Sequence, residues 1–245
     1  MKIIDNIKLF LRRSCADLSK QQESVCLNAV DIFLNEYGFL KSLVNNSPVD
    51  KKGAPIPWYT YPAIEFISQF DLRDKIVFEY GAGNSSLFWA TRAKKVVSVE
   101  NNSEWYKHIT KLAPPNLEML FCTDEVNYVS SIENYFCKFD VIAIDGAFRL
   151  KATKKALVKL AEGGMIIFDN SDRAVGLEEY SLATSCLRDS GYTQVDMSGF
   201  GPVNGYAWTT SFFFKQKFSF ETRDLIQPHT PVGGNVITPV GTVQA

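Results

Sequence analysis

Short apolar runs recur along the chain from residue 75 to residue 169. They are KIVFE (75–79), KVVSVE (95–100), LEMLFC (117–122), FDVIAID (139–145) and GMIIFD (164–169). Continuous runs of this length are typical of parallel strands that are buried on both faces. Because most of the intervals between them are long enough for a helix, the pattern predicts an α/β fold with a doubly wound, mostly parallel sheet.

Two further runs follow each other more closely. YTQVDMSGF (192–200) and YAWTTSFFFK (206–215) are joined by GPVNG, which predicts a hairpin and therefore an antiparallel last strand. The expected sheet is thus seven-stranded and Rossmann-like. Residues 150–164 (LKATKKALVKLAEGG) predict one of its helices, with the final glycine pair expected just beyond the helix C-terminus.

The start of the chain shows helical periodicity. Residues 20–45 predict a helix with an apolar stripe and with Ser19 and Gln22 as a capping box. An apolar helical face over residues 3–11 is expected to pack on the domain or, alternatively, to lie on a membrane surface. The stripe consists of Cys26, Ala29, Val30, Phe33 and Tyr37.

A loop rich in Pro, Gly and Asn follows the predicted helices, and Pro62 then opens another helix. These changes of pattern predict an N-terminal helical extension or lid (1–60), one α/β domain (61–217) and a loosely ordered C-terminal tail (218–245).

The bulk charge of the chain limits its partners. A formal net charge of −1 provides no basic field for nucleic acid, so no nucleic-acid partner is expected. No apolar run approaches the ~18 residues of a membrane span, so no integral membrane segment is expected. The five cysteines are scattered without Cys-x-x-Cys spacing, which indicates reduced thiols and a cytoplasmic protein.

A glycine turn directly follows the first predicted strand, in IVFEYGAGNSSLFWA (76–90). A dinucleotide-binding loop has a third glycine where this chain has Ser86, and Glu79 would repel a pyrophosphate. The loop therefore fits a cationic nucleoside better. Ligands of open α/β sheets bind beyond the carboxyl ends of the strands. Acidic residues stand at these ends, namely Glu79, Glu100, Asp124, Asp145 and Asp169.

Two motifs carry a resemblance to a known family. VFEYGAGNSS (77–86) resembles the first motif of class I S-adenosylmethionine-dependent methyltransferases, and VVSVE (96–100) resembles their second motif. The similarity spans about residues 70–215 and implies S-adenosylmethionine as the cofactor. It places Glu79, Gly81 and Gly83 at the methionine end of this donor, with Asn84 and Ser85 beside them, Glu100 at the ribose, Asp124 near the adenine and Asp145 at the same site.

A second resemblance concerns a metal. AIDGAFRL (143–150) and GMIIFDNSD (164–172) place Asp145, Asp169 and Asn170 at the ends of neighbouring strands. Three oxygen ligands suit Mg²⁺, which lowers the pKa of a bound hydroxyl. The pattern is similar to that of the metal-dependent O-methyltransferases of the catechol, caffeoyl-CoA and macrocin types, and by that likeness these three residues are metal ligands and Asp145 is catalytic.

The chain also departs from these enzymes. Phe148 stands where the catechol type has a lysine base, and Ala147 stands where the sugar enzymes have an acidic residue. The alternative is that Asp145 closes the donor pocket while Asp169 caps the following helix.

Aromatic residues indicate where an acceptor binds. Trp58, Tyr59 and Tyr61 suit a sugar or an aromatic ring, or alternatively pack over the domain. The segment 199–208 (GFGPVNGYAW) is either a mobile loop beside the acceptor or a tight hairpin. No Asn/Asp-Pro-Pro-Tyr turn follows the fourth strand and no Pro-Cys pair occurs, which disfavours methylation of nucleic-acid bases.

The sequence therefore predicts an S-adenosylmethionine-dependent methyltransferase that acts on a hydroxyl of a small molecule or glycan. Two alternatives remain, an aminopropyltransferase-like enzyme and a non-catalytic module that binds S-adenosylmethionine. A homo-oligomer is also left open.

Overall fold

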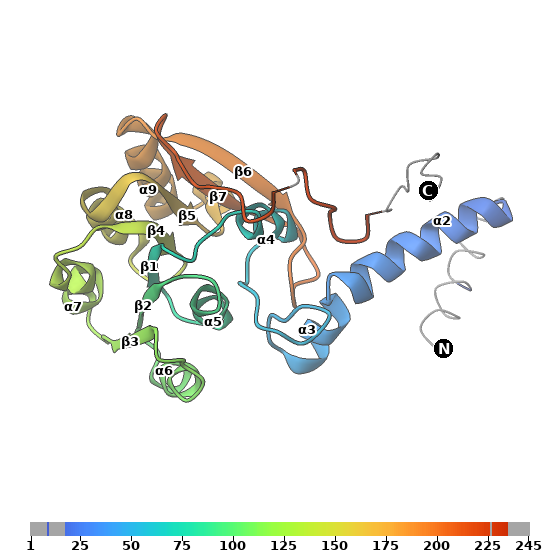
Figure 1. Cartoon of the computed structure of the whole chain (residues 1–245), viewed down its shortest axis with the longest axis horizontal. Helices are drawn as coiled ribbons and strands as arrows, with labels where there is room; N and C mark the ends of the chain where they lie inside the picture. The colour runs from blue at the N-terminus through green and yellow to red at the C-terminus, as the bar shows by residue number, and fades with distance from the viewer. Residues whose placement is uncertain (1–8, 10–17, 226, 235–245) are drawn as a thin grey trace, which may run out of the picture.

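Seven strands form one sheet at the centre of the molecule (Figure 1). The structure is a computed structural model that describes residues 9, 18–225 and 227–234. The order across the sheet is β3-β2-β1-β4-β5-β7-β6, with β7 antiparallel to both β5 and β6. The strands are β1 (Ile76–Tyr80), β2 (Lys95–Glu100), β3 (Leu117–Phe121), β4 (Phe139–Ile144), β5 (Leu160–Phe168), β6 (Thr193–Gly199) and β7 (Trp208–Phe214).

The sheet confirms the predicted fold class. Chain order reverses between β1 and β4, where successive crossovers pass to opposite sides, so the carboxyl ends of these strands flank the usual ligand crevice of such folds. The predicted hairpin of β6 and β7 is present. Strand β7 pairs with β5, so β6 forms the edge of the sheet.

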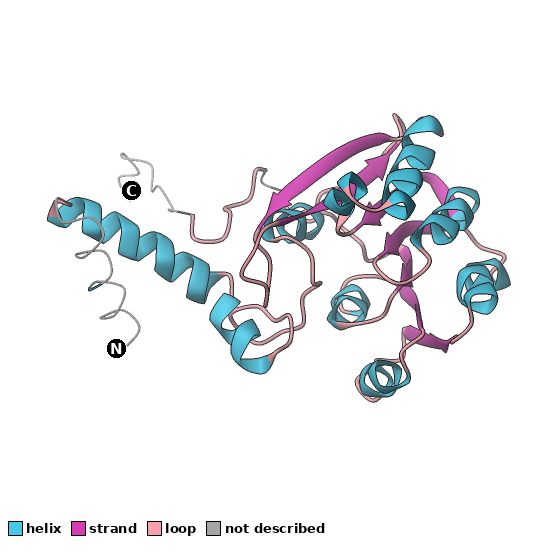
Figure 2. Cartoon of the chain, turned by 180° about the vertical axis from the view of Figure 1, so that it is seen from behind, coloured by secondary structure: helices cyan, strands magenta, loops and turns pink. Residues whose placement is uncertain are grey.

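Helices cover both faces of the sheet (Figures 1 and 2). Side chains alternate between the faces along each strand. In β1, Val77 belongs to the core cluster shared with α4, α5 and α6, whereas Phe78 and Tyr80 belong to the cluster shared with α7, α8 and α9. The covering helices are α4 (Tyr61–Ser68), α5 (Asn84–Ala90), α6 (Ser103–Thr110), α7 (Glu125–Ser130), α8 (Arg149–Lys159) and α9 (Glu178–Asp189).

The predicted end of α8 is wrong. The helix ends at Lys159, and the glycine pair lies four residues later inside β5. Pairing of β5 with β4 is interrupted between Leu160 and Met165, and Gly163 has φ +77° within this interruption. Gly163 therefore accommodates an irregularity of the strand, because a positive φ is strained for other residues.

The predicted helix over residues 20–45 is divided into three parts. They are α2 (Lys20–Asp31), the π-helical turn η1 (Ile32–Glu36) and α3 (Phe39–Asn45). Ser19 and Gln22 form the predicted capping box of α2. Gly38 has φ +76°, and a Cβ there would lie 2.5 Å from the backbone carbon of Asp50, so the helical path is broken where it meets the following loop.

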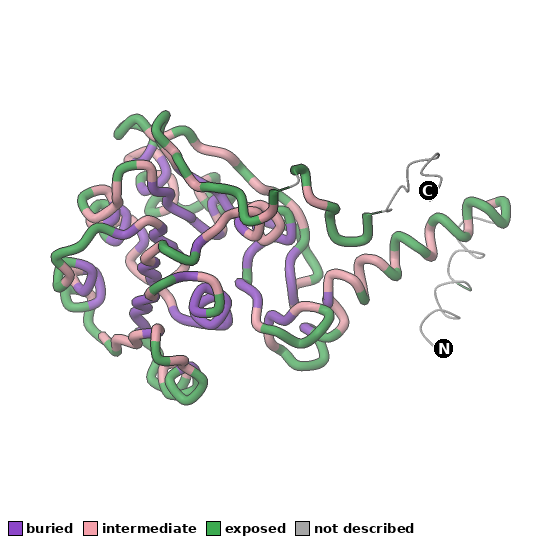
Figure 3. The backbone as a smooth tube through the Cα atoms, in the orientation of Figure 1, coloured by how far each residue is buried: buried purple, intermediate pink, exposed green. Residues whose placement is uncertain are grey.

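Helix α2 extends away from the sheet and contains no buried residue, as Figures 1 and 3 show. Of its predicted stripe, only Phe33 and Tyr37 pack against the core, and both lie beyond α2. Helix α4 begins at Tyr61, next to the predicted Pro62. The predicted helical face over residues 3–11 lies almost entirely outside the described residues.

Packing of the chain onto the sheet continues past residue 217. Phe218 and Phe220 pack against the core, and Thr222 forms a β-bridge with Phe70. Over the described ranges, no helix has the length and apolar character needed to span a membrane. The short 3₁₀ turns are η2 (Ser131–Asn134) and η3 (Ser171–Val175).

Candidate functional site

The strand register brings the predicted acidic residues to one edge of the sheet. Tyr80 of β1 pairs with Val99 of β2 and with Ile144 of β4, so Gly81 follows between Glu100 and Asp145. Ile144 pairs in turn with Phe168, so Asp169 follows beside Asp145. This edge is the expected ligand-binding edge of an open α/β sheet.

Glu79 lies beneath the glycine turn. Its Oε2 accepts hydrogen bonds from the hydroxyls of Ser86 and Ser98, and the Ser86 oxygen accepts a further bond from the Gly83 N–H. Its Oε1 is buried and has no hydrogen-bond partner within the described chain. Burial is the main cause that raises the pKa of Glu79 to about 7. Glu79 thus fixes the turn and presents an unsatisfied acceptor.

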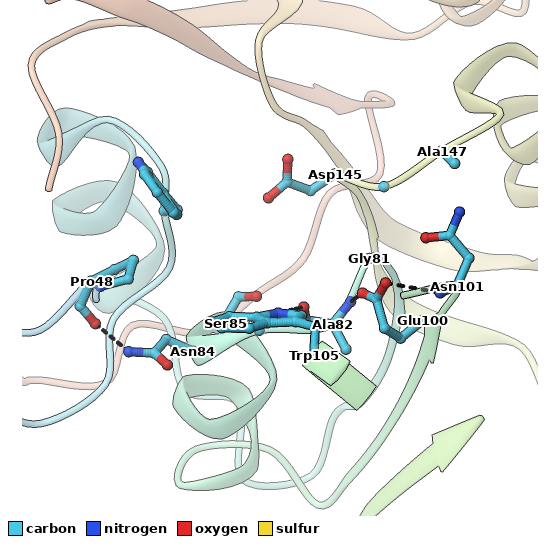
Figure 4. A pocket seen from close by; sticks show the side chains of 13 residues that line it. Pro48, Gly81, Ala82, Asn84, Ser85, Glu100, Asn101, Trp105, Asp145 and Ala147 are labelled. Carbon is cyan, nitrogen blue, oxygen red and sulfur yellow. Dashed lines mark hydrogen bonds between the residues drawn. The ribbon is translucent and has the colours of Figure 1, made fainter. Parts of the chain in front are cut away.

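A cavity of about 340 Å³ opens above this turn (Figure 4). The glycine turn and the start of α5 form one side, and the residues after β2 and β4 form another. The predicted donor residues Gly81, Gly83, Asn84, Ser85, Glu100 and Asp145 all line it, together with Pro48, Trp58, Ala82, Asn101, Trp105, Gly146 and Ala147.

We call this cavity the donor cavity, after the predicted donor residues that line it. Glu100 is held rigidly at its wall. Its carboxylate accepts hydrogen bonds from the N–H groups of Ala82 (3.0 Å), Asn101 (2.9 Å) and Asn102 (2.7 Å). The Trp105 indole donates to the carbonyl oxygen of Ala82 at 2.5 Å, so its ring is also fixed against the turn. Both side chains are preorganised, which limits the entropy lost when a ligand binds.

The segment before α4 covers part of the donor cavity. Asn84 donates from its amide nitrogen to the Pro48 carbonyl (2.6 Å) and to the Ser47 hydroxyl (2.9 Å), as Figure 4 shows for Pro48. The Ser42 hydroxyl fastens the same segment by bonds to both the carbonyl and the N–H of Val49. The Asn84 amide therefore holds the cover, and Trp58 at its far end faces the cavity.

A second cavity of about 350 Å³ adjoins the first, and the two share Trp58 and Asp145. Its floor is formed by residues that follow β4 and β5, and its mouth by η3 and the β6–β7 loop. The lining is polar and aromatic: Trp58, Asp145, Arg149, Asp169, Asn170, Arg173, Asn204, Tyr206 and Trp208.

Arg149 pairs with the carboxylate of Asp145 and binds the backbone around both acidic residues of the floor. Its Nη2 donates to Asp145 Oδ1 at 3.1 Å, and its other nitrogens donate to the carbonyl oxygens of Gly146, Ile144 and Asp169. Burial is the main cause that raises the pKa of Asp145 to about 6. Burial, followed by the charge of Asp145, raises the pKa of Asp169 to about 8. Burial therefore opposes the ionisation of both carboxyl groups, whereas the Arg149 guanidinium favours the ionised form of Asp145.

The three predicted metal ligands line this second cavity, yet their environment does not suit Mg²⁺. The Arg149 guanidinium already pairs with Asp145, and Asp169 Oδ1 accepts bonds from Trp208 Nε1 (3.1 Å) and the Thr210 hydroxyl (2.5 Å). An adjacent guanidinium that already pairs with the carboxylate disfavours a divalent cation at Asp145.

The remaining predicted residues lie outside both cavities, and so does Glu79, which is fully buried beneath the turn. Asp124 is exposed and accepts a hydrogen bond from the Asn127 N–H as the N-cap of α7. Tyr61 is buried and packs against Tyr37, with ring centroids 4.6 Å apart. Tyr59 is fully buried, and its hydroxyl has no hydrogen-bond partner in the described part of the chain. Burial, and then the charge of Asp145, raises the pKa of Tyr59.

Several lining residues had not been identified from the sequence. Pro48, Asn101, Arg173 and Asn204 belong to loops or short turns, which have no periodicity to distinguish them. The sequence predicts the segment 199–208 as either a mobile loop beside the acceptor or a tight hairpin, and three of its residues line the second cavity. Only for Asn101 does the sequence offer a signal of a position in the cavity lining, because this residue directly follows Glu100, the acidic residue of the second motif.

Comparison with known proteins gives no family assignment: no protein-family model and no curated protein matches this sequence. Solved structures share parts of the fold. Precorrin-6y C5,15-methyltransferase from Geobacter metallireducens GS-15 is 14% identical with a TM-score of 0.48, over 63% of this chain and 87% of that one. Spermidine synthase from Thermotoga maritima is 16% identical with a TM-score of 0.47, over 64% of this chain and 56% of that one.

A third structure is precorrin 8w decarboxylase from Methanobacterium thermoautotrophicum, 17% identical with a TM-score of 0.47, over 69% of this chain and 95% of that one. At these identities and TM-scores no conclusion is drawn from the likeness, and conclusions on chemistry depend on the cavities themselves. The chain has a mostly parallel, seven-stranded Rossmann-like sheet with an antiparallel strand β7.

Proposed function

We propose that this protein is an S-adenosylmethionine-dependent methyltransferase that acts on a hydroxyl group of a small molecule or a glycan unit. The observation that carries the proposal is the pair of adjoining cavities at the carboxyl edge of the sheet, which share Asp145 and Trp58. Transfer between two ligands needs two sites that meet at one point, and this edge provides them.

The donor cavity fits S-adenosylmethionine by its chemistry. Glu79 does not line the cavity, but its buried, unpartnered Oε1 beneath the turn favours a cation bound nearby. Glu100 in the wall offers a fixed carboxylate for ribose hydroxyls. Trp105 provides a flat apolar wall. When bound, the donor supplies a methyl group on a sulfonium, which is a good electrophile. Gly81, Gly83, Asn84 and Ser85 form the remaining predicted wall, and a role of Asp124 at the adenine stays a prediction.

Asp145 is the proposed catalytic residue. It lies where the cavities meet, and the Arg149 guanidinium at 3.1 Å orients it and favours its ionised form. A carboxylate so placed can accept the proton that the acceptor hydroxyl loses as its oxygen is methylated. Trp58 lines both cavities and restricts the position of the acceptor. Tyr59 and Tyr61 belong to the core and are not part of the proposed acceptor site.

Mg²⁺ is not part of the proposal, because the Arg149 guanidinium already pairs with Asp145. We expect turnover to persist in a chelator, and its loss there would restore Asp145, Asp169 and Asn170 as ligands.

The second cavity also distinguishes the alternatives. An aminopropyltransferase must bind a polycationic acceptor, whereas this cavity is lined by the guanidinium groups of Arg149 and Arg173. A non-catalytic module would bind the donor without turnover.

The decisive test is a calorimetric titration with S-adenosylhomocysteine, followed by an acceptor screen that measures methyl transfer with and without a chelator. We expect binding that is lost in Glu100→Ala, and turnover that needs Asp145. Absence of binding would overturn the donor site. Binding of the product with aminopropyl transfer, or without any turnover, would favour one of the alternatives.

A further inference from the structure

Arg173 differs from the other charged side chains of the second cavity. Arg149 and Asp145 form an ion pair, and Asp169 accepts bonds from Trp208 and Thr210. Arg173 lies at the exposed mouth, and within the described residues its guanidinium hydrogen-bonds only the Tyr180 hydroxyl, at 3.3 Å. No carboxylate there lies within ion-pair distance, so most of its five N–H donors are unused.

Two amide side chains at the same cavity are also unused. Asn170 and Asn204 both line it, and neither side chain makes a hydrogen bond within the described chain. Asn170 is held in a left-handed conformation (φ 54°) at the start of η3, and Asn204 comes from the β6–β7 loop. The cavity therefore has unused N–H donors at its mouth and carboxyl groups at its floor.

The contrast between N–H donors at the mouth and carboxyl groups at the floor defines the orientation of an acceptor. We infer that the acceptor is an anionic molecule of single-ring size, whose carboxylate or phosphate binds Arg173 at the mouth while its hydroxyl reaches Asp145 at the floor. A guanidinium fork matches both anions. The volume of about 350 Å³ suits a compact ring. Tyr206 and Trp208, which pack edge to face with ring centroids 6.0 Å apart, provide an aromatic part of the lining. The inference depends on the proposed function, because it assigns the acceptor of that site.

The test compares anions with a neutral analogue of the same shape. Benzoate, phenyl phosphate and benzamide are titrated separately into the full chain, with and without saturating S-adenosylhomocysteine. We expect benzoate or phenyl phosphate to bind more tightly than benzamide, and the stronger of the two identifies the anion. Arg173→Gln should weaken anion binding about tenfold or more, and Arg173→Lys should recover part of it.

Arg188→Gln is the matched control. Arg188 is an exposed arginine of α9 that lines neither cavity and donates to Gln194 and Ser185, so anion binding should be unchanged. Equal binding of benzamide, no binding of either anion, or no effect of Arg173→Gln would each overturn the inference. Failure of the donor site is seen separately, as absent binding of S-adenosylhomocysteine in the same unmodified protein.

Discussion

Glu79 combines two roles that conflict in a single carboxyl group. It accepts hydrogen bonds from Ser86 and Ser98 and so supports the glycine turn, but it is removed from water and keeps one oxygen unsatisfied. Burial opposes its ionisation, which raises its pKa from an ordinary 4.5 to about 7. A nearby cationic ligand would favour the ionised form.

This conflict predicts a pH dependence of donor binding. As pH rises from 6 to 8, Glu79 ionises and the affinity for S-adenosylhomocysteine, through its ammonium group, should rise by up to about tenfold. Calorimetric titrations across this range measure the effect. Glu79→Gln should flatten the profile, and an unchanged slope in that variant would assign the dependence to another group.

The same shift has the opposite consequence for folding. The folded chain retains a proton on Glu79 between pH 4.5 and about 7, whereas the unfolded chain has already lost it. The contribution of Glu79 to stability is therefore fully present below pH 4.5 and is lost as pH rises through about 7.

Asp145 gives the most direct test of the chemistry. Asp145→Asn keeps the size of the side chain and removes the base, so kcat should fall about 10²- to 10⁴-fold. S-adenosylhomocysteine affinity should change little, because the cavity walls formed by Glu100 and Trp105 remain. A parallel loss of binding or of the thermal midpoint would mean that Asp145 has a structural role through Arg149.

At the level of elements, the loops after β1 and β4 meet backbone to backbone. A Cβ on Gly81, which has φ +93°, would lie 2.7 Å from the Gly146 Cα. A Cβ on Gly146 would lie 2.8 Å from the Gly81 nitrogen and would also meet the Tyr128 hydroxyl. These two glycines therefore allow the loops that carry Asp145 and the donor turn to approach each other.

Gly146→Ala should separate the loops. We expect weaker binding of S-adenosylhomocysteine and a loss of unfolding free energy of about 1–3 kcal/mol from overpacking, measured by calorimetry and denaturant unfolding. The double variant with Tyr128→Phe should recover part of both, because it removes the obstructing oxygen. Gly176→Ala is the control, since a Cβ there meets no atom within 4 Å. A Gly146→Ala protein with unaltered binding would contradict this account.

The strands were predictable because buried parallel strands leave continuous apolar runs in the sequence. The acidic residues at their ends were predictable for the same reason, and their register explains why Asp145 and Asp169 are neighbours. The interactions of these acids were not predictable. The pairing of Arg149 with Asp145, and of Asn84 with Pro48, depends on how α8 and the covering segment fold against the sheet.

At the scale of the whole molecule, the helices differ in how firmly they belong to the folded body. Helix α9 packs Ala183 and Leu187 into the core, whereas α2 has no buried residue and extends from the body in Figure 1. An isolated helix of this length is marginal in water. We therefore expect α2 to open independently of the sheet and of the two cavities.

Proline substitutions in the two helices test this division. Asn28→Pro in α2 should reduce helical circular dichroism but leave the thermal midpoint and S-adenosylhomocysteine binding unchanged. Ser185→Pro in α9 should lower the unfolding free energy by about 3 kcal/mol or more, since the helix must distort while its neighbours stay packed on the sheet. If Asn28→Pro lowers the midpoint as much as Ser185→Pro, α2 belongs to the cooperative unit. Its exposed face would then be covered in solution, and a lower midpoint on dilution would identify a second copy of the chain as the cover.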